Sequence, residues 1–100
     1  MNDFGLSSKN LSALIKIFKK HSEIERVMIF GSRATGRYKP GSDVDLALWQ
    51  REGTDVIARL YSDLEDSTIP YFFDIVDFRS LEADKFKQTI ERDGVVVYKL

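Results

Sequence analysis

Cysteine is absent from this chain of 100 residues, and histidine occurs once, at His21. The lack of cysteine excludes disulfide bonds and thiolate metal sites, and a single histidine excludes a histidine-rich zinc site. No apolar run approaches the length that crosses a membrane, and the first residues do not show a basic segment followed by an apolar one. We therefore expect a cytoplasmic protein without membrane attachment.

Charge of either sign is in no large excess, because 15 lysines and arginines face 16 aspartates and glutamates, for a net charge of −1. Direct nucleic-acid binding is therefore not expected, since it calls for a basic field. A content of 43% hydrophobic and 31% charged residues is typical of a folded globular protein. The length suits one domain, which we place at residues 1–100.

Periodic apolar residues predict three helices. The first contains Leu11 to Phe18 and is capped by Ser7 or Ser8, and the second runs from Val56 to Leu64 with Thr54 as its N-cap. The third begins after an N-cap at Ser80 and stops at Gly94. Four apolar runs, at 27–30, 44–49, 71–78 and 95–98, predict short strands, and residues 33–42 predict a loop that opens with a helical turn after Ser32. The alternation indicates an α/β or α+β fold, with a small mixed β-sheet and flanking helices, and we expect α+β.

The loop between the first two strands carries the main functional signal. It reads Gly31-Ser32, then ten residues, then Asp43-Val44-Asp45. Gly31 permits a sharp turn and a close approach of backbone to a ligand, and Ser32 offers a hydroxyl and an N–H where a helix begins, which is the usual geometry for binding anions. Three cations follow in the loop, and they either contact phosphates or are ordinary exposed charges: Arg33, Arg37 and Lys39.

Asp43 and Asp45 are two residues apart, so a strand would project both carboxylates from one face. Two neighbouring carboxylates repel each other, and a divalent cation such as Mg²⁺, which prefers oxygen ligands, would relieve the repulsion. The alternative is a pair of solvated aspartates at the start of a strand. The Gly-Ser turn and the basic loop before the pair favour the metal site.

Asp74 is a third acid, inside the apolar strand Tyr71–Phe78, where a carboxylate is costly without a partner. A neighbouring strand can bring it beside Asp43 and Asp45, where it would ligate the metal and accept the proton of an attacking hydroxyl. The alternative is a hydrogen-bonded structural acid. Asp77 lies on the opposite strand face and is expected to cap or to meet solvent. The aromatic side chains are assigned to core faces, and His21 has no evident partner.

These residues resemble the nucleotidyltransferase superfamily of DNA polymerase beta, and the small size resembles its minimal nucleotidyltransferase (MNT) branch. The likeness covers nearly the whole chain and implies the polymerase beta-like fold. It implies that Gly31 and Ser32 hold the β- and γ-phosphates of a nucleotide, ATP being the expected substrate. It also implies that Asp43 and Asp45 bind two Mg²⁺ ions and that Asp74 binds one of them and activates the acceptor hydroxyl.

The resemblance further implies a partner. Family members of this size are commonly paired with a helical HEPN protein, often as the antitoxin of a HEPN ribonuclease toxin. One hundred residues leave no room for the helical domain by which larger relatives grip base and acceptor, so we expect recognition through a partner, in a hetero-oligomer or a homo-oligomer. Two other functions remain open: a binding module that neutralises its partner by contact, and a transferase acting on a small molecule such as an aminoglycoside.

Overall fold

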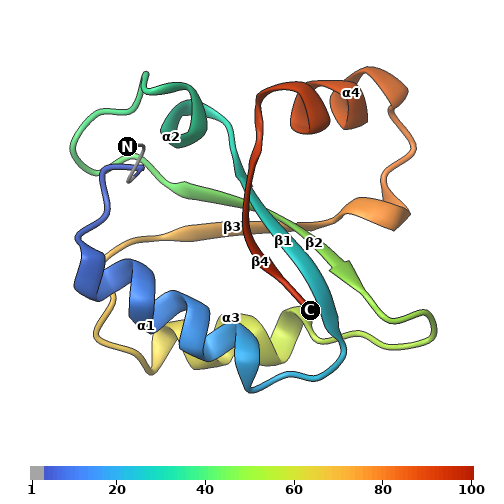
Figure 1. Cartoon of the computed structure of the whole chain (residues 1–100), viewed down its shortest axis with the longest axis horizontal. Coiled ribbons are helices and arrows are strands. Elements are labelled where there is room, and N and C mark those ends of the chain that lie inside the picture. Colours follow the sequence, from blue (N-terminus) through green and yellow to red (C-terminus); the bar gives the residue numbers. More distant parts are fainter. Residues whose placement is uncertain (1–3) are drawn as a thin grey trace.

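The computed structural model describes residues 4–100, which form one mixed sheet with helices on both faces (Figure 1). The strands are β1 (Ile24–Phe30), β2 (Val44–Gln50), β3 (Phe73–Asp77) and β4 (Val95–Lys99). The helices are α1 (Ser8–Lys19), the single turn α2 (Ser32–Thr35), α3 (Ile57–Glu65) and α4 (Asp84–Asp93), with a 3₁₀ turn η1 at Phe78–Ser80. The strand order is β3-β2-β1-β4, with β2 and β3 parallel and the other two pairs antiparallel. The predicted α+β class is confirmed.

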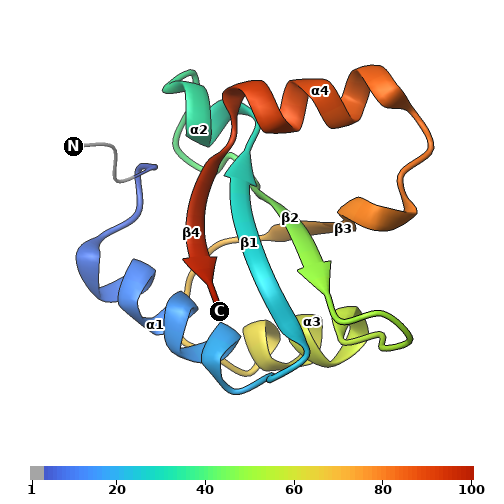
Figure 2. The same cartoon turned by 45° about the vertical axis from the view of Figure 1, so that its right-hand side comes forward.

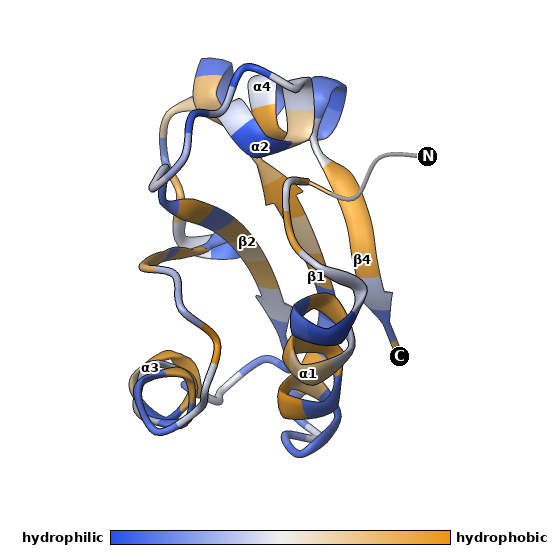
Figure 3. Cartoon of the chain, turned by 90° about the vertical axis from the view of Figure 1, so that its left-hand side faces the viewer, coloured by the Kyte–Doolittle hydropathy of each residue, from blue (hydrophilic) through white to orange (hydrophobic). Residues whose placement is uncertain are grey.

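One face of the sheet is closed by α1 and α3. Both helices turn apolar residues inward and polar residues outward, which Figure 3 shows for α3 viewed nearly end-on. Fully buried side chains from both helices and from the two central strands form this larger core, among them Leu14, Phe18, Leu60, Val27 and Leu46. Burial of these side chains is the main force that holds α1 and α3 on the sheet.

The opposite face carries a smaller core under α4 and η1. Its buried members are Met28, Phe30, Ala47, Trp49, Phe78 and Ile90. Trp49 stacks on Phe78 with ring centroids 4.2 Å apart, at the end of β2 as expected from the sequence. α4 crosses the end of the sheet close to α2 (Figure 2). Near the start of β2, Asp45 projects from this second face, because it shares strand parity with Ala47 and Trp49.

Helix starts were predicted only in part. Ser7 is the N-cap of α1, because its Oγ accepts a hydrogen bond from the Asn10 N–H at 3.0 Å. Thr54 is not a cap: its hydroxyl donates to the Arg51 carbonyl at 2.6 Å, and α3 begins only at Ile57. Ser80 is not a cap either, since its hydroxyl donates to Asp77 Oδ2 at 2.9 Å within η1. Both hydroxyls serve tight turns that delay the next helix.

Strand lengths also differ from the prediction. β1 begins three residues earlier than expected, because Ile24 and Arg26 also pair with β2, with a register irregularity between them. β3 is shorter than the apolar run 71–78, since it gains partners only opposite β2. Gly94 ends α4 as predicted, but with φ −73°, and a Cβ there would meet the Ile90 carbonyl and Met28. Close packing, rather than a left-handed turn, therefore explains the glycine.

Two polar side chains have partners that the sequence did not reveal. His21 Nε2 lies 2.6 Å from Asp63 Oδ2 and joins the end of α1 to α3. Asp77 accepts hydrogen bonds from Ser80 and Gln50 through Oδ2, while its Oδ1 is buried without a hydrogen bond. Neither His21 nor Asp77 is bonded to Asp43, Asp45 or Asp74. In the described residues, no helix is both long and apolar enough to span a bilayer.

Candidate active site

The strand register places Asp45 and Asp74 side by side. Asp45 is paired with Asp74 on the parallel strand β3 and with Phe30 on the antiparallel strand β1. Paired positions on adjacent strands project from the same face, and adjacent strands are only about 4.8 Å apart. Asp43, two residues before Asp45, is exposed directly before β2 begins, and strand parity places it on the same face. The three acids predicted from the sequence are therefore neighbours on the sheet face that α4 only partly covers.

The charges of Asp74 and Asp43 act on Asp45 in the folded chain. The pKa of Asp45 is raised, first by its burial and then by the negative charges of Asp74 and Asp43. Within residues 4–100, none of these three carboxylates forms an ion pair or accepts a hydrogen bond from another side chain. The setting is that of anionic oxygens without a cationic partner, which is the donor set that Mg²⁺ prefers.

The predicted convergence of all three acids on one ion is not confirmed by the side-chain positions. In the described part of the chain, no group of three potential ligands is close enough together to hold a metal ion. Asp45 is half-buried, whereas Asp43 and Asp74 are exposed at the surface. The strand register thus brings the acids onto one sheet face, while the three carboxylates do not converge on one point.

The backbone of Gly31, at the start of the loop, passes close to the carboxylate of Asp45. It has φ +73° and ψ −153°, a conformation that is essentially restricted to glycine. A Cβ at this position would overlap Asp45 Oδ2. Ser32 follows at the first position of α2, as the sequence predicted. Gly31 therefore borders the Asp45 carboxylate on the side of β1.

Arg33 departs from the prediction of a phosphate contact. Its side chain is 2% exposed, and its guanidinium donates to the Ser42 carbonyl at 2.8 and 3.1 Å and to the Phe4 carbonyl at 2.8 Å. The same group lies over the rings of Tyr38 and Tyr71. The Arg33 donors are thus bonded to backbone carbonyls of the protein and not directed at a ligand. The bonds to Ser42 hold the loop immediately before Asp43.

Arg37 and Lys39 are exposed in the loop. The pKa of Asp93 on α4 is lowered, mainly by its hydrogen bond with Arg92 and in smaller part by the charge of Arg37. Arg37 therefore lies near the end of α4. Lys39 opens a tight turn, in which its N–H donates to Ser42 Oγ at 2.9 Å and the Ser42 N–H donates back to the Lys39 carbonyl at 3.0 Å.

Phe72 is the residue near the acids that sequence reasoning missed. All aromatic side chains were assigned to core faces, and this assignment is wrong for Phe72, whose side chain is 80% exposed. Its strand parity with Asp74 was the signal available in the sequence, because a residue beside the acid at the same end of the strand need not face the core. Its carbonyl accepts a hydrogen bond from the Val44 N–H at 2.9 Å, so it lies immediately before the first pair of the β2–β3 ladder, Val44 with Phe73.

This fold, with acids on neighbouring strands beside a Gly-Ser turn, is that of a nucleotidyltransferase domain, and comparisons agree. A family model described as "Polymerase beta, Nucleotidyltransferase" matches residues 12–100. The Haemophilus influenzae protein named "Probable protein adenylyltransferase MntA" is 31% identical over 94 residues, which are 92% of this chain and 82% of that protein. The chain belongs to the polymerase beta nucleotidyltransferase family and is similar to its MntA members.

Solved structures show the same fold. The crystal structure of a toxin–antitoxin with AMP-PNP has a TM-score of 0.74 and 24% identity, covering 91% of this chain and 74% of that one. A tri-AMPylated Shewanella oneidensis HEPN toxin in complex with MNT antitoxin gives a TM-score of 0.66 and 22% identity, covering 92% and 71% of the two chains. These two likenesses support the fold assignment. The enzyme class, a nucleotidyltransferase, follows from the family.

Proposed function

We propose that this protein transfers AMP from ATP to a hydroxyl group of a HEPN-type helical partner, as the antitoxin of a toxin–antitoxin pair. The observation that carries the proposal is the register pair Asp45–Asp74, flanked by Asp43 and bordered by Gly31. The name of the Haemophilus influenzae relative and the AMPylated toxin in the Shewanella oneidensis complex support AMP as the group transferred and a HEPN protein as its recipient.

In the proposed reaction, β3 supplies the proton acceptor and the residues that follow β1 bind the phosphates. The acceptor oxygen attacks the α-phosphorus of ATP, the new O–P bond forms, and the bond to the bridging oxygen breaks to release pyrophosphate. Asp74, the exposed acid on β3, accepts the proton of the acceptor hydroxyl. The β- and γ-phosphates lie at the backbone of Gly31 and at Ser32, with Arg37 and Lys39 at the entrance. Arg33 contributes by holding the loop rather than by contacting phosphate.

Asp43 and Asp45, with Asp74 for one ion, are the residues that would hold Mg²⁺. They fit the ion because the strand register brings anionic oxygens onto one sheet face and because the raised pKa of Asp45 reflects burial and repulsion that a cation would offset. Bound Mg²⁺ would neutralise the charge that develops on the phosphoryl oxygens.

The test is incubation with radiolabelled ATP and MgCl₂, with and without a HEPN-type protein encoded beside this one, followed by mass spectrometry of the partner. We expect the partner to gain one or more AMP groups, and Asp45→Asn to reduce transfer by at least about a hundredfold, the scale of losing a transition-state charge contact. Glu52→Gln is the matched control, because Glu52 is exposed beyond the far end of β2.

A partner that stays unmodified, yet is neutralised equally well by the Asp43→Asn/Asp45→Asn double variant, would replace this proposal with neutralisation by contact alone. Modification of the partner that requires both acids would exclude that alternative. Transfer of AMP to a small molecule in place of the protein would contradict the proposed acceptor.

A further inference from the structure

The position of Phe72 suggests a function, which rests on the function proposed above. Single exposed apolar side chains are ordinary on protein surfaces. Phe72, however, is 80% exposed, compared with 38% for Phe86, and lies two residues before Asp74 on the same strand face. Its carbonyl accepts a hydrogen bond from the Val44 N–H, so the ring projects from backbone that is held by the sheet. An exposed aromatic ring on fixed backbone, beside the proposed proton acceptor Asp74, is well suited to binding a substrate group.

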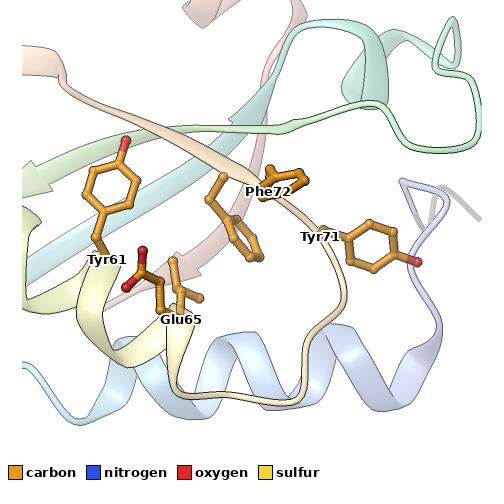
Figure 4. Close-up of a pocket in the computed structure, with 6 residues that line it drawn as sticks. Tyr61, Glu65, Tyr71 and Phe72 are labelled. Atoms are coloured by element: carbon orange, nitrogen blue, oxygen red, sulfur yellow. The ribbon is translucent and has the colours of Figure 1, made fainter.

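Figure 4 shows how the neighbouring side chains divide around this strand. Tyr61 and Glu65 rise from α3 on one side, where they line a hollow of about 200 Å³ together with Leu64, Tyr71, Phe72 and Phe73. Phe73 packs against the larger core, as its strand parity requires. Phe72 also borders this hollow, but in Figure 4 its ring lies on the side of the strand away from α3, and strand parity assigns that side to Asp74.

The sheet order determines which substrate can reach Phe72. Across the sheet, Gly31 and Ser32 follow β1, Asp45 lies on β2, and Phe72 and Asp74 lie at β3, the outer strand. With the β- and γ-phosphates at Gly31 and Ser32, pyrophosphate departs toward β1. In phosphoryl transfer the attacking and leaving oxygens lie roughly in line on opposite sides of phosphorus. The acceptor must therefore approach from the β3 side, where Phe72 stands.

The outer edge of β3 limits how the acceptor can bind there. The Ile75 N–H, which would otherwise be free for a further strand, donates to the Tyr61 hydroxyl at 2.8 Å. A partner segment cannot extend the sheet at this position without displacing Tyr61. Recognition at this edge therefore relies on side chains, and the exposed Phe72 ring is the apolar group beside Asp74.

We propose that Phe72 binds the protein acceptor, by packing its ring against apolar side chains of the partner segment that carries the reactive hydroxyl, and that it does not bind the nucleotide. The occupant is a polypeptide rather than the adenine base, because the base leaves the α-phosphate through the 5′ oxygen, off the line that joins the acceptor to pyrophosphate. Phe72 is thus a residue that determines acceptor specificity.

The experiment compares Phe72→Ala with the wild-type protein on the HEPN-type partner. We expect kcat/KM for the partner at saturating ATP to fall about tenfold or more, as for removal of an aromatic anchor from an interface. The Kd for AMP-PNP with MgCl₂, measured by calorimetry, should not change. Leu100→Ala is the control, because Leu100 is 76% exposed at the far end of β4 and should leave both values unchanged.

Phe72→Ala should also leave the unfolding midpoint unchanged, since the ring is mostly exposed, and Phe72→Leu should recover part of the lost kcat/KM. An unchanged kcat/KM for the partner, or a Kd for AMP-PNP that rises as much as kcat/KM falls, would overturn the inference. The wild-type protein separates the two proposals: if it modifies no partner, the proposed function fails, whereas a failure confined to Phe72 appears only when the wild type is active.

Discussion

Among the described residues, Arg33 is the charged side chain with the least exposure, and its position predicts a structural effect. Replacement by methionine keeps much of the apolar stem but removes the hydrogen bonds to the Ser42 and Phe4 carbonyls. Hydrogen bonds from a charged group are the stronger kind, so we expect Arg33→Met to lower the free energy of unfolding by about 2–4 kcal/mol. Urea denaturation would measure this change.

Arg37→Met is the control for that comparison, because Arg37 is exposed four residues further along the same loop. We expect it to change the free energy of unfolding by less than about 0.5 kcal/mol, as exposed surface substitutions usually do. Equal stability of the two variants would show that the loop does not depend on the Arg33 guanidinium.

Gly31 predicts a second effect at the residue scale, since its backbone conformation and its contact with Asp45 both exclude a side chain. Gly53→Ala provides the comparison: Gly53 also has positive φ, at +82°, but a Cβ there would meet nothing within 4 Å. Gly53→Ala should cost about 1–2 kcal/mol of backbone strain alone. Gly31→Ala should cost more and should displace the Asp45 carboxylate, so nucleotide transfer should also be lost. Thermal unfolding and the transfer assay together distinguish the two glycines.

At the scale of elements, α4 is the most weakly anchored of the three longer helices. It buries only Ile90, whereas α1 buries Leu14, Ile17 and Phe18 and α3 buries Leu60 and Leu64. Phe86 adds a partly exposed contact to the ring of Phe30, with centroids 5.7 Å apart. We expect amide hydrogens of α4 to exchange by local opening well before those of α1 and α3. Protection of α4 equal to that of α1 would contradict this order.

The elements themselves were largely predictable, because apolar periodicity records which face of each helix or strand is buried. Their ends were less predictable. Thr54 and Ser80 have the chemistry of helix caps, but each bonds within a turn that only the folded chain forms. The early start of β1 depends on pairing with β2, which no local signal reveals.

Some features of the candidate site were predictable from local sequence, and others depend on contacts that form only in the folded chain. The spacing of Gly31, Asp43 and Asp45 is local, so the sequence predicted their proximity. The pairing of Asp74 with Asp45 could be expected only through strand parity and the family resemblance. The burial of Arg33 was not foreseen, because it depends on Phe4, Tyr38 and Tyr71 meeting around one guanidinium.

At the scale of the whole molecule, the acid cluster should make stability depend on pH. Burial, then Asp74 and Asp43, raise the pKa of Asp45 in the folded state. A raised carboxyl pKa favours folding while the group is protonated, so stability falls as pH rises from the unfolded-state value of about 4 through the folded-state pKa. In metal-free buffer at neutral pH, Asp45→Asn should therefore unfold at a slightly higher temperature than the wild type.

The same comparison at a pH below about 4 should show no such advantage, because Asp45 is then protonated in both states. MgCl₂ at neutral pH should raise the unfolding temperature of the wild type more than that of Asp45→Asn, since a bound ion stabilises the folded state. Calorimetric scans at the two pH values give both results. A large loss of stability in Asp45→Asn without metal would identify Asp45 as a structural acid.

The parallel pairing of β2 with β3 also affects the order in which the molecule becomes active as it folds. Gly31 and Asp45 are brought together by the connection between β1 and β2, whereas Asp74 reaches Asp45 only after the longer connection that contains α3 has closed. Longer loops cost more entropy to close, and long-range pairings form slowly. In refolding from denaturant, nucleotide transfer should thus recover later than the β1–β2 hairpin, so partly folded chains present half of the site and no activity.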